Sequence, residues 1–262
     1  MILLGIETAT ELVGVSVADD DGPRATVWAT GRRRHAESLA PAVAHVLDQA
    51  GLALADVEVV AVDVGPGLFT GLRVGVTTAK ALAQGLDVGV VPCTSVDVLA
   101  AAAYAAGWTG PVAAVVDARR GEVFVARYVS DPAAVDGWRQ VSGPTRFSPA
   151  DLAVELAGAG ATTDGATTDG ATTDGAAAGW LEVGDGARRY ADALAVVPGL
   201  RVAGPVSPPP DALAALAVRR LAAGGPDGPV LQAPAEVQPI YLREADARIN
   251  WTQRDPVPPA GG

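Results

Sequence analysis

The sequence predicts an α/β protein built from two similar halves, each a mixed β-sheet flanked by helices. Three observations support this fold class. Short apolar runs of strand length alternate with segments whose apolar residues recur at helical spacing. Three strand-like runs come first, and strands and helices then alternate. A second, less complete copy of this order begins near the middle of the chain.

The first half starts with three strands. They are expected at 1–7, 12–18 and 25–30, separated by the turn-like ETATE and DDDGP. In the helix that follows, Ser38 is the expected N-cap, Pro41 falls in the first turn, and Gly51 ends the run. Strand, helix and strand then follow at 57–64, 71–84 and 88–92, and Gly85 ends that helix. A meander followed by crossover units is the order with which a ribonuclease-H-like half begins.

The second half repeats this order in part. Strands at 112–117 and 122–128 pair as a hairpin around ARRG, and further strands are expected near 138–142 and at 180–183. Helices are expected after the Ser148 N-cap and at 187–195 and 211–222. The pentapeptide ATTDG repeats at 161–175, and because Thr, Asp and Gly cannot build a core, it predicts a disordered surface insertion.

These elements predict the domain boundaries. Residues 1–105 form the first lobe, which the helix at about 208–224 joins. Residues 106–207 form a smaller second lobe that contains the insertion. Residues 245–262 are expected to be a frayed tail.

The composition favours a cytoplasmic protein that does not grip nucleic acid alone. The net charge is -11 and Lys80 is the only lysine, so no basic face for phosphate contacts is evident. Cys93 is the only cysteine, which excludes an internal disulfide and a thiolate zinc cluster. The N-terminus lacks the basic region of a signal peptide, and the most apolar stretch is broken by Pro92 and Asp97, so no membrane span is expected.

The stretch DVGPGLFTGLRVG, residues 63–75, raises the question of a phosphate-binding loop. Its glycines miss the spacing of both the P-loop and the dinucleotide fingerprint, and no Lys-Ser or Lys-Thr pair follows them. Gly71, Gly75 and Ala79 instead recur every four residues and give one helix face very little bulk. That face predicts a close contact, either inside this chain's own core or with a helix of another subunit.

Several motifs together resemble the TsaB (YeaZ) family. They are GIETAT at the start, GPGLFTGLRVG in the middle, DARRGEVF at 117–124 and PIYLRE near the end. HAESLAP, VGDGARRY and the helix after SPPP also fit, so the resemblance covers most of the chain outside the insertion and the tail. It implies an actin/Hsp70-like fold of two ribonuclease-H-like lobes with mixed sheets flanked by helices. It also implies a dimerisation subunit of the bacterial machinery that makes threonylcarbamoyladenosine at adenosine 37 of tRNAs reading codons that start with A.

The resemblance further implies that the chain is not an enzyme by itself. In such a complex a catalytic paralog, TsaD, carries the metal and the chemistry. The TsaB-type chain binds this paralog through its N-terminal lobe, and a small ATPase, TsaE, docks onto the pair. tRNA is then bound only through the complex, ATP or ADP belongs to the complex, and the isolated chain can form a homodimer. No cofactor and no metal are assigned to this chain.

A comparison with the catalytic paralog supports this assignment. The paralog holds its metal with an H-x-x-x-H pair, which aligns here with Ser95 and Leu99. Leucine cannot ligate a metal, and serine is a poor ligand without carboxylates beside it. The only histidines, His35 and His45, both precede the glycine stretch. Neither His35 nor the nearby Glu37 belongs to a recognisable Ser-His-Asp or Cys-His arrangement, so no catalytic residue is assigned.

The predicted partner interface is a two-helix face formed by residues 38–50 and 71–84, with an apolar centre and a polar rim. Its candidate residues are Leu39, Val43, Val46, Gly71, Leu72, Gly75, Val76 and Ala79. How many of them face this chain's own core instead is left open.

A candidate nucleotide or interlobe cleft contains Glu7 and Thr8 at the first strand–turn, together with Asp117 and Arg119 in the ARRG hairpin. Glu7 is alternatively a turn carboxylate held by local hydrogen bonds, and the hairpin is alternatively an exposed turn. Two other function classes also stay open. An actin-fold ATPase or kinase would use the cleft at Glu7 and Asp117, and a self-associating protein with a glycoprotease-like or regulatory role would need no paralog.

Overall fold

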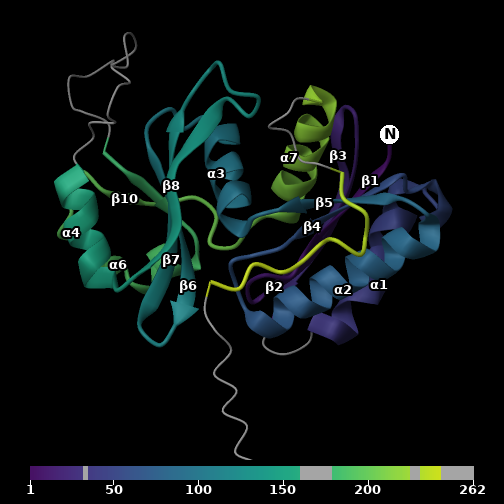
Figure 1. The fold of residues 1–262 in the computed structure, drawn as a ribbon, viewed down its shortest axis with the longest axis horizontal. Coiled ribbons are helices and arrows are strands. Elements are labelled where there is room, and N and C mark those ends of the chain that lie inside the picture. Colours follow the sequence, from purple (N-terminus) through teal and green to yellow (C-terminus); the bar gives the residue numbers. More distant parts are fainter. Residues whose placement is uncertain (32–34, 160–178, 225–230, 243–262) are drawn as a thin grey trace, which may run out of the picture.

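A computed structural model describes residues 1–31, 35–159, 179–224 and 231–242 of the chain (Figure 1). The ATTDG repeat at 161–175 and the predicted tail at 245–262 lie outside the described residues. Two five-stranded sheets stand side by side with helices on both sides of each, which confirms the predicted α/β fold of two halves (Figure 1).

The first sheet has the strand order β3-β2-β1-β4-β5. Its three antiparallel strands come first in the chain, and β4 and β5 then add in parallel beside β1. The elements are β1 Leu3–Glu7, β2 Leu12–Asp19, β3 Gly22–Thr30, α1 His35–Ala50, β4 Val59–Asp63, α2 Phe69–Leu86 and β5 Gly89–Cys93. A single turn of 3-10 helix at Leu54–Asp56 leads from α1 into β4.

The second sheet repeats this arrangement, in the order β8-β7-β6-β9-β10. Here β6 takes the place of β1, β7 and β8 pair with it as an antiparallel meander, and β9 lies parallel on its other side. The elements are α3 Ser95–Ala105, β6 Val112–Arg119, β7 Glu122–Ser130, β8 Trp138–Phe147, α4 Pro149–Ala159, β9 Leu181–Val183, α5 Asp185–Arg189, α6 Ala191–Leu194, β10 Arg201–Val202 and α7 Pro210–Ala223.

The helices form three layers around the two sheets (Figure 1). Successive side chains of β1 point to opposite faces, so Leu4 packs with α1 and α2 while Leu3 packs with α7. The helices α3 and α7 lie between the two sheets and share one apolar core with both of them. On the far face of the second sheet, α4 and α6 cover a separate core that includes Leu152 and Leu194. The central strands β1, β2, β4, β6 and β9 are therefore buried on both faces, which explains why they read as continuous apolar runs, whereas the outer strands β3, β8 and β10 are largely exposed.

Two predicted helix boundaries are wrong. Helix α1 begins at His35, so Ser38 and Pro41 lie inside it. The ring of the buried His35 bonds the Thr10 carbonyl and ties the extra turn to the loop between β1 and β2. Helix α2 runs past Gly85 to Leu86, and Asp87 supplies the left-handed cap with φ 59°. Asp tolerates this conformation better than most residues, so no glycine is required there.

Two further differences concern the helices of the second half. The sequence does not predict helix α3. Most of its residues are buried against elements on several sides, so they show little amphipathic pattern. The helix expected at 187–195 is interrupted at Tyr190, where α5 ends and α6 begins. Among the described residues, no helix combines the length and apolar character needed to cross a membrane.

Candidate functional site

The glycine stretch forms the turn from β4 into α2, and it lies directly against the end of β1. The Leu68 N–H donates to the Ala9 carbonyl, and the Thr8 hydroxyl donates to the Gly71 carbonyl. A Cβ at Gly67 would collide with the Ala9 carbonyl, and one at Gly71 would collide with the Thr8 carbonyl. A Cβ at Gly75 would meet the Thr8 hydroxyl. The glycines are therefore required for close packing inside this chain.

The structure places all of the predicted interface residues in this chain's own core, and none of their side chains is available on the surface. Those concerned are Leu39, Val43, Val46, Gly71, Leu72, Gly75, Val76 and Ala79. The reason is that the apolar stripe of each helix packs on the first sheet, as expected for an amphipathic helix that covers a sheet. A partner can contact α1 and α2 only through the residues on their outward faces, which lie outside these buried stripes.

A pocket of about 550 Å³ opens between the two lobes, at the N-terminal end of α2. Its apolar wall comes from α2 and the turn before it, and its charged wall comes from the loop after β1, from β6 and from α5. The lining residues are Glu11, His35, Ala36, Leu68, Phe69, Thr70, Gly71, Val74, Arg119 and Arg189. Of the four cleft residues that the sequence predicts, Arg119 alone is among them.

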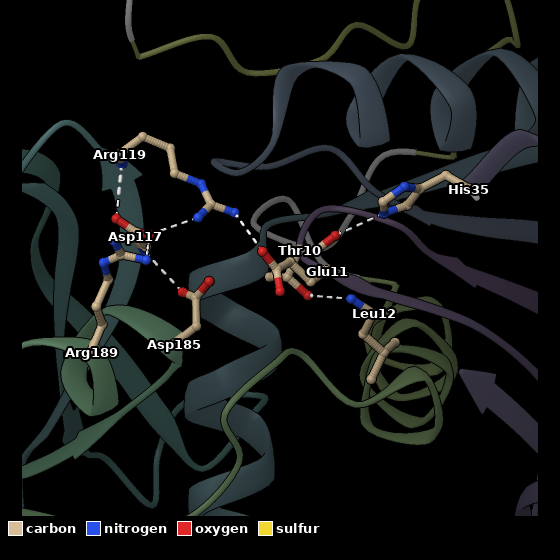
Figure 2. Close-up of polar contacts among 8 residues, drawn as sticks. All are labelled: Thr10, Glu11, Leu12, His35, Asp117, Arg119, Asp185 and Arg189. Atoms are coloured by element: carbon tan, nitrogen blue, oxygen red, sulfur yellow. Dashed lines mark hydrogen bonds and ion pairs between the residues drawn. The ribbon is translucent and has the colours of Figure 1, made fainter. Parts of the chain in front are cut away.

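Arg119 joins the two lobes across this pocket. Its guanidinium lies 3.1 Å from Glu11 Oε1 of the first lobe and 3.3 Å from Asp117 Oδ2 of the second lobe (Figure 2). Arg119 has φ 63°, a left-handed conformation that costs a non-glycine residue roughly 1 kcal/mol. Strain of this kind is often retained at functional sites, because the surrounding structure must hold the residue in place.

Asp117 forms ion pairs with both arginines of this charged wall. Its side chain is 3% exposed, and Arg189 approaches its Oδ2 at 3.5 Å from the opposite side to Arg119 (Figure 2). Its backbone N–H donates to Asp185 Oδ1 at 2.8 Å. Burial raises the pKa of Asp185 to about 6, and the adjacent Asp117 carboxylate adds to the rise.

Glu7 and Thr8 lie beneath the pocket and not in its wall. Both are fully buried, and Glu7 Oε1 accepts the Ala9 N–H at 2.7 Å, as a turn carboxylate does. Beside Glu7 lies Asp63, which ends the neighbouring strand β4 and is also fully buried. Burial raises the pKa of both carboxyl groups, and the proximity of Asp63 raises that of Glu7 further. Neither side chain reaches the pocket, so neither can contact a ligand there in this structure.

Sequence reasoning missed most of the residues that build this site. Asp63 and Asp185 lie at the carboxyl ends of the parallel strands β4 and β9, and that position alone could have marked them. Phe69 and Arg189 lie inside quoted motifs, but nothing in the sequence marks them or Glu11 as members of one site, because only the packing of the two lobes brings them together. In the part of the chain that the structure describes, no three His, Cys, Asp or Glu side chains are arranged to hold a metal ion.

Comparisons with known proteins give the family. The chain is 30% identical over 161 residues to the "tRNA threonylcarbamoyladenosine biosynthesis protein TsaB" of Haemophilus influenzae, covering 60% of this chain and 68% of that protein. It belongs to the TsaB family. The TsaB of Escherichia coli is 34% identical over 131 residues, which cover 50% of this chain and 56% of that protein.

The family is also supported by structure. YeaZ of Pseudomonas aeruginosa superimposes with a TM-score of 0.71 at 27% identity, covering 92% of this chain and 99% of that one. The family profile that matches this sequence, at residues 29–154, is described as "TsaD: tRNA N6-adenosine threonylcarbamoyltransferase". This chain therefore resembles the transferase family over a segment that includes α1, α2 and the glycine turn.

Proposed function

We propose that this chain is a non-catalytic subunit of the machinery that makes threonylcarbamoyladenosine in tRNA, and that it binds the catalytic paralog TsaD. The observation that carries the proposal concerns Ser95 and Leu99, which align with the two metal-binding histidines of the paralog. Ser95 donates its hydroxyl to Asp63 Oδ1 at 2.7 Å, and Leu99 is fully buried in the core between the sheets. Both side chains are committed to the packing of α3. In this proposal the chain supplies a binding surface, TsaE docks onto the assembled pair, and tRNA is contacted through the complex.

The proposed partner surface consists of the outward faces of α1 and α2, which lie next to each other over the first sheet (Figure 1). On these outward faces, the helices expose small side chains that include Ala40, Ala44, Thr77 and Ala81. Small residues allow the backbones of two helices to approach closely, so another helix pair could dock here without a change in the core. His45 and Gln84 are also exposed on these helices, where they could contribute to a polar rim.

The test is co-purification with the paralog. We expect Thr77→Arg to abolish the complex, because the long charged side chain would stand in the centre of the surface. The melting temperature of the isolated chain should not change, because Thr77 is exposed. Val154→Arg, at a position on α4 that is 74% exposed, is the matched control and should assemble normally. If both Thr77→Arg and Ala44→Arg assemble like the wild type, this surface is not the interface.

A second candidate function is small-ligand binding in the pocket between the lobes. The pocket volume of about 550 Å³ is within the range of small-molecule sites, and it combines an apolar wall with two arginines. Calorimetric titration with ATP and ADP, on the wild type and on Arg119→Met, tests it. Turnover of ATP by the isolated chain that is lost in Asp117→Ala would favour an ATPase, and no heat of binding would remove this candidate. Size-exclusion chromatography with and without the paralog separates the proposed scaffold from a self-sufficient homodimer.

A further inference from the structure

Two carboxyl groups face each other at the end of the first sheet. Glu7 ends β1 and Asp63 ends β4, and these strands run parallel with Ile6 opposite Val62. Both side chains are 0% exposed, and each carboxyl group has one buried oxygen, Glu7 Oε2 or Asp63 Oδ2, for which the described structure shows no hydrogen-bond partner. An ionised carboxylate can only accept hydrogen bonds. Two adjacent carboxyl groups that are shielded from water cannot both stay ionised, so one of them must carry a proton, which the other can accept in a hydrogen bond.

The remaining contacts indicate where the proton resides. Asp63 Oδ1 accepts the Gly65 N–H and the Ser95 hydroxyl, each at 2.7 Å, and such bonds favour the ionised form. Burial and the adjacent Asp63 both raise the pKa of Glu7 and so favour its protonated form. Glu7 Oε2 and Asp63 Oδ2 have no other hydrogen-bond partner among the described residues, so each is available to the other. The proton accordingly belongs on Glu7 Oε2, and the negative charge belongs on Asp63.

Among the described residues, no basic side chain takes the place of this proton. Across the described residues, neither Glu7 nor Asp63 has an ion pair with a basic side chain. The charged or titratable groups that face them are Asp97 on α3, Cys93 at the end of β5, and His35 of α1 through the Thr10 carbonyl. Asp97 adds negative charge and is itself paired with Arg220 at 3.2 Å. Burial raises the pKa of the Cys93 thiol to about 12, so that group stays neutral.

The pair also joins three parts of the molecule that converge beneath the pocket. Glu7 holds the turn after β1 through the Ala9 N–H, and Asp63 holds the glycine turn through the Gly65 N–H. Ser95 connects the pair to the first turn of α3, the helix that lies between the two sheets. Loss of the bond between Glu7 and Asp63 would place two like charges in contact at this junction.

We propose that Glu7 and Asp63 share one proton at neutral pH, and that this proton locks β1, the glycine turn and α3 together beneath the interlobe pocket. On alkaline titration, the proton leaves Glu7 Oε2 for the solvent, the two carboxylates repel each other, and the junction loosens. Stability is therefore fully present below the ordinary pKa of glutamate and is lost as the pH rises through the raised pKa of Glu7.

The test compares the wild type with Glu7→Gln in urea unfolding from pH 5 to pH 10. The glutamine amide donates to Asp63 at every pH, so the variant should lack the alkaline loss. The unfolding constant of the wild type should rise relative to that of the variant by up to tenfold per pH unit while Glu7 is protonated only in the folded chain. Parallel stability profiles for the two proteins would overturn the proposal.

Two further measurements cover the case in which Glu7→Gln does not fold. Asp63→Asn is the converse variant: it keeps the bond but moves the charge onto Glu7, and it should be less stable than Glu7→Gln at neutral pH. Infrared difference spectroscopy of the wild type should show the carbonyl stretch of a protonated buried acid at neutral pH, and this band should disappear on alkaline titration together with stability. Absence of the band at neutral pH would show that no proton is shared.

Discussion

The two sheets place acidic groups at the carboxyl ends of equivalent strands, but they stabilise these groups in different ways. We call the ends of β1 and β4 the first edge, and the ends of β6 and β9 the second edge. In the first sheet, Glu7 and Asp63 end β1 and β4, and the structure brings them together with no basic side chain of the described residues in contact. In the second sheet, Asp117 near the end of β6 and Asp185 after β9 meet through a backbone N–H. Two arginines then balance the charge of Asp117. We infer that a shared proton stabilises the acidic groups of the first edge, whereas ion pairs with arginine stabilise those of the second edge.

Access to solvent accounts for this difference. The first edge is covered by the glycine face of α2, which packs so closely on Thr8 that no long side chain can enter. The second edge opens onto the pocket, where Arg119 and Arg189 are 39% and 55% exposed and keep part of their hydration. A buried charge must find a partner or lose its charge, whereas an exposed one can use a flexible cation. The same fold can therefore support either arrangement, depending on what covers the strand ends.

The largest expected effect comes from breaking the cover of the first edge. Gly71→Ala places a methyl group against the Thr8 carbonyl, and neither backbone segment can move without disturbing β1 or α2. We expect a loss of about 3 kcal/mol in the free energy of unfolding, measured in urea. Gly75→Leu should have a larger effect and prevent folding, because even the Cβ of its side chain would collide with the Thr8 hydroxyl.

The control for this prediction lies in the same helix. A methyl group at Gly85 would meet nothing within 4 Å beyond the backbone of its own helix, so Gly85→Ala should stabilise the chain by about 0.5–1 kcal/mol through helix propensity. Equal effects of the two alanines would mean that α2 does not cover the first edge as described.

The features of the fold that could be predicted from the sequence are those that depend on residues close together in the chain. The strands and the hairpin around ARRG followed from apolar runs and turn residues, and the N-cap at Ser148 is confirmed by its bond from the Asp151 N–H. The glycine face was recognised as a site of close contact, but the sequence left open whether the contact is internal, and the structure shows that it lies on Thr8. Spacing along a helix identifies its apolar stripe and does not say which surface covers that stripe.

The candidate site could be predicted only in fragments, for a different reason. Asp117 and Arg119 were found because they share one hairpin, whereas the Glu11 and Arg189 side chains that complete the charged wall are distant in sequence. The pairing of Glu7 with Asp63 depends on β1 and β4 being adjacent and in register. Such contacts follow from the topology, which no single motif encodes.

A third acid sharpens the comparison, because it has neither a shared proton nor an ion pair. Glu182 on β9 is 0% exposed, and neither carboxylate oxygen has a hydrogen-bond partner in the described structure. Burial raises its pKa to about 7 from the ordinary 4.5, so the folded chain loses stability as the pH rises between these values. We expect Glu182→Met to be more stable than the wild type by about 3 kcal/mol at pH 8.5. The gain should shrink towards pH 4.5, as measured by urea unfolding.

Glu182→Gln serves as the control for that prediction. It removes the ionisable group but leaves a buried amide without partners, so it should lack the pH dependence that Glu182 contributes and should stay less stable than Glu182→Met. A wild type whose stability does not fall between pH 4.5 and pH 7 relative to both variants would mean that Glu182 has a partner or access to water.

The smallest expected effect comes from the cation of the second edge. Arg119→Met removes the ion pairs with Glu11 and Asp117, but these pairs are partly exposed and Arg189 still faces Asp117, so the loss should stay below about 1 kcal/mol. Because surface ion pairs are screened, the difference from the wild type should diminish in high salt. Arg119→Gly is the matched variant: it removes the same charge but accepts φ 63° without strain, and it should be more stable than Arg119→Met by about 1 kcal/mol. A loss above about 2 kcal/mol in Arg119→Met, or one that salt does not reduce, would mean that the second edge is as closed to solvent as the first.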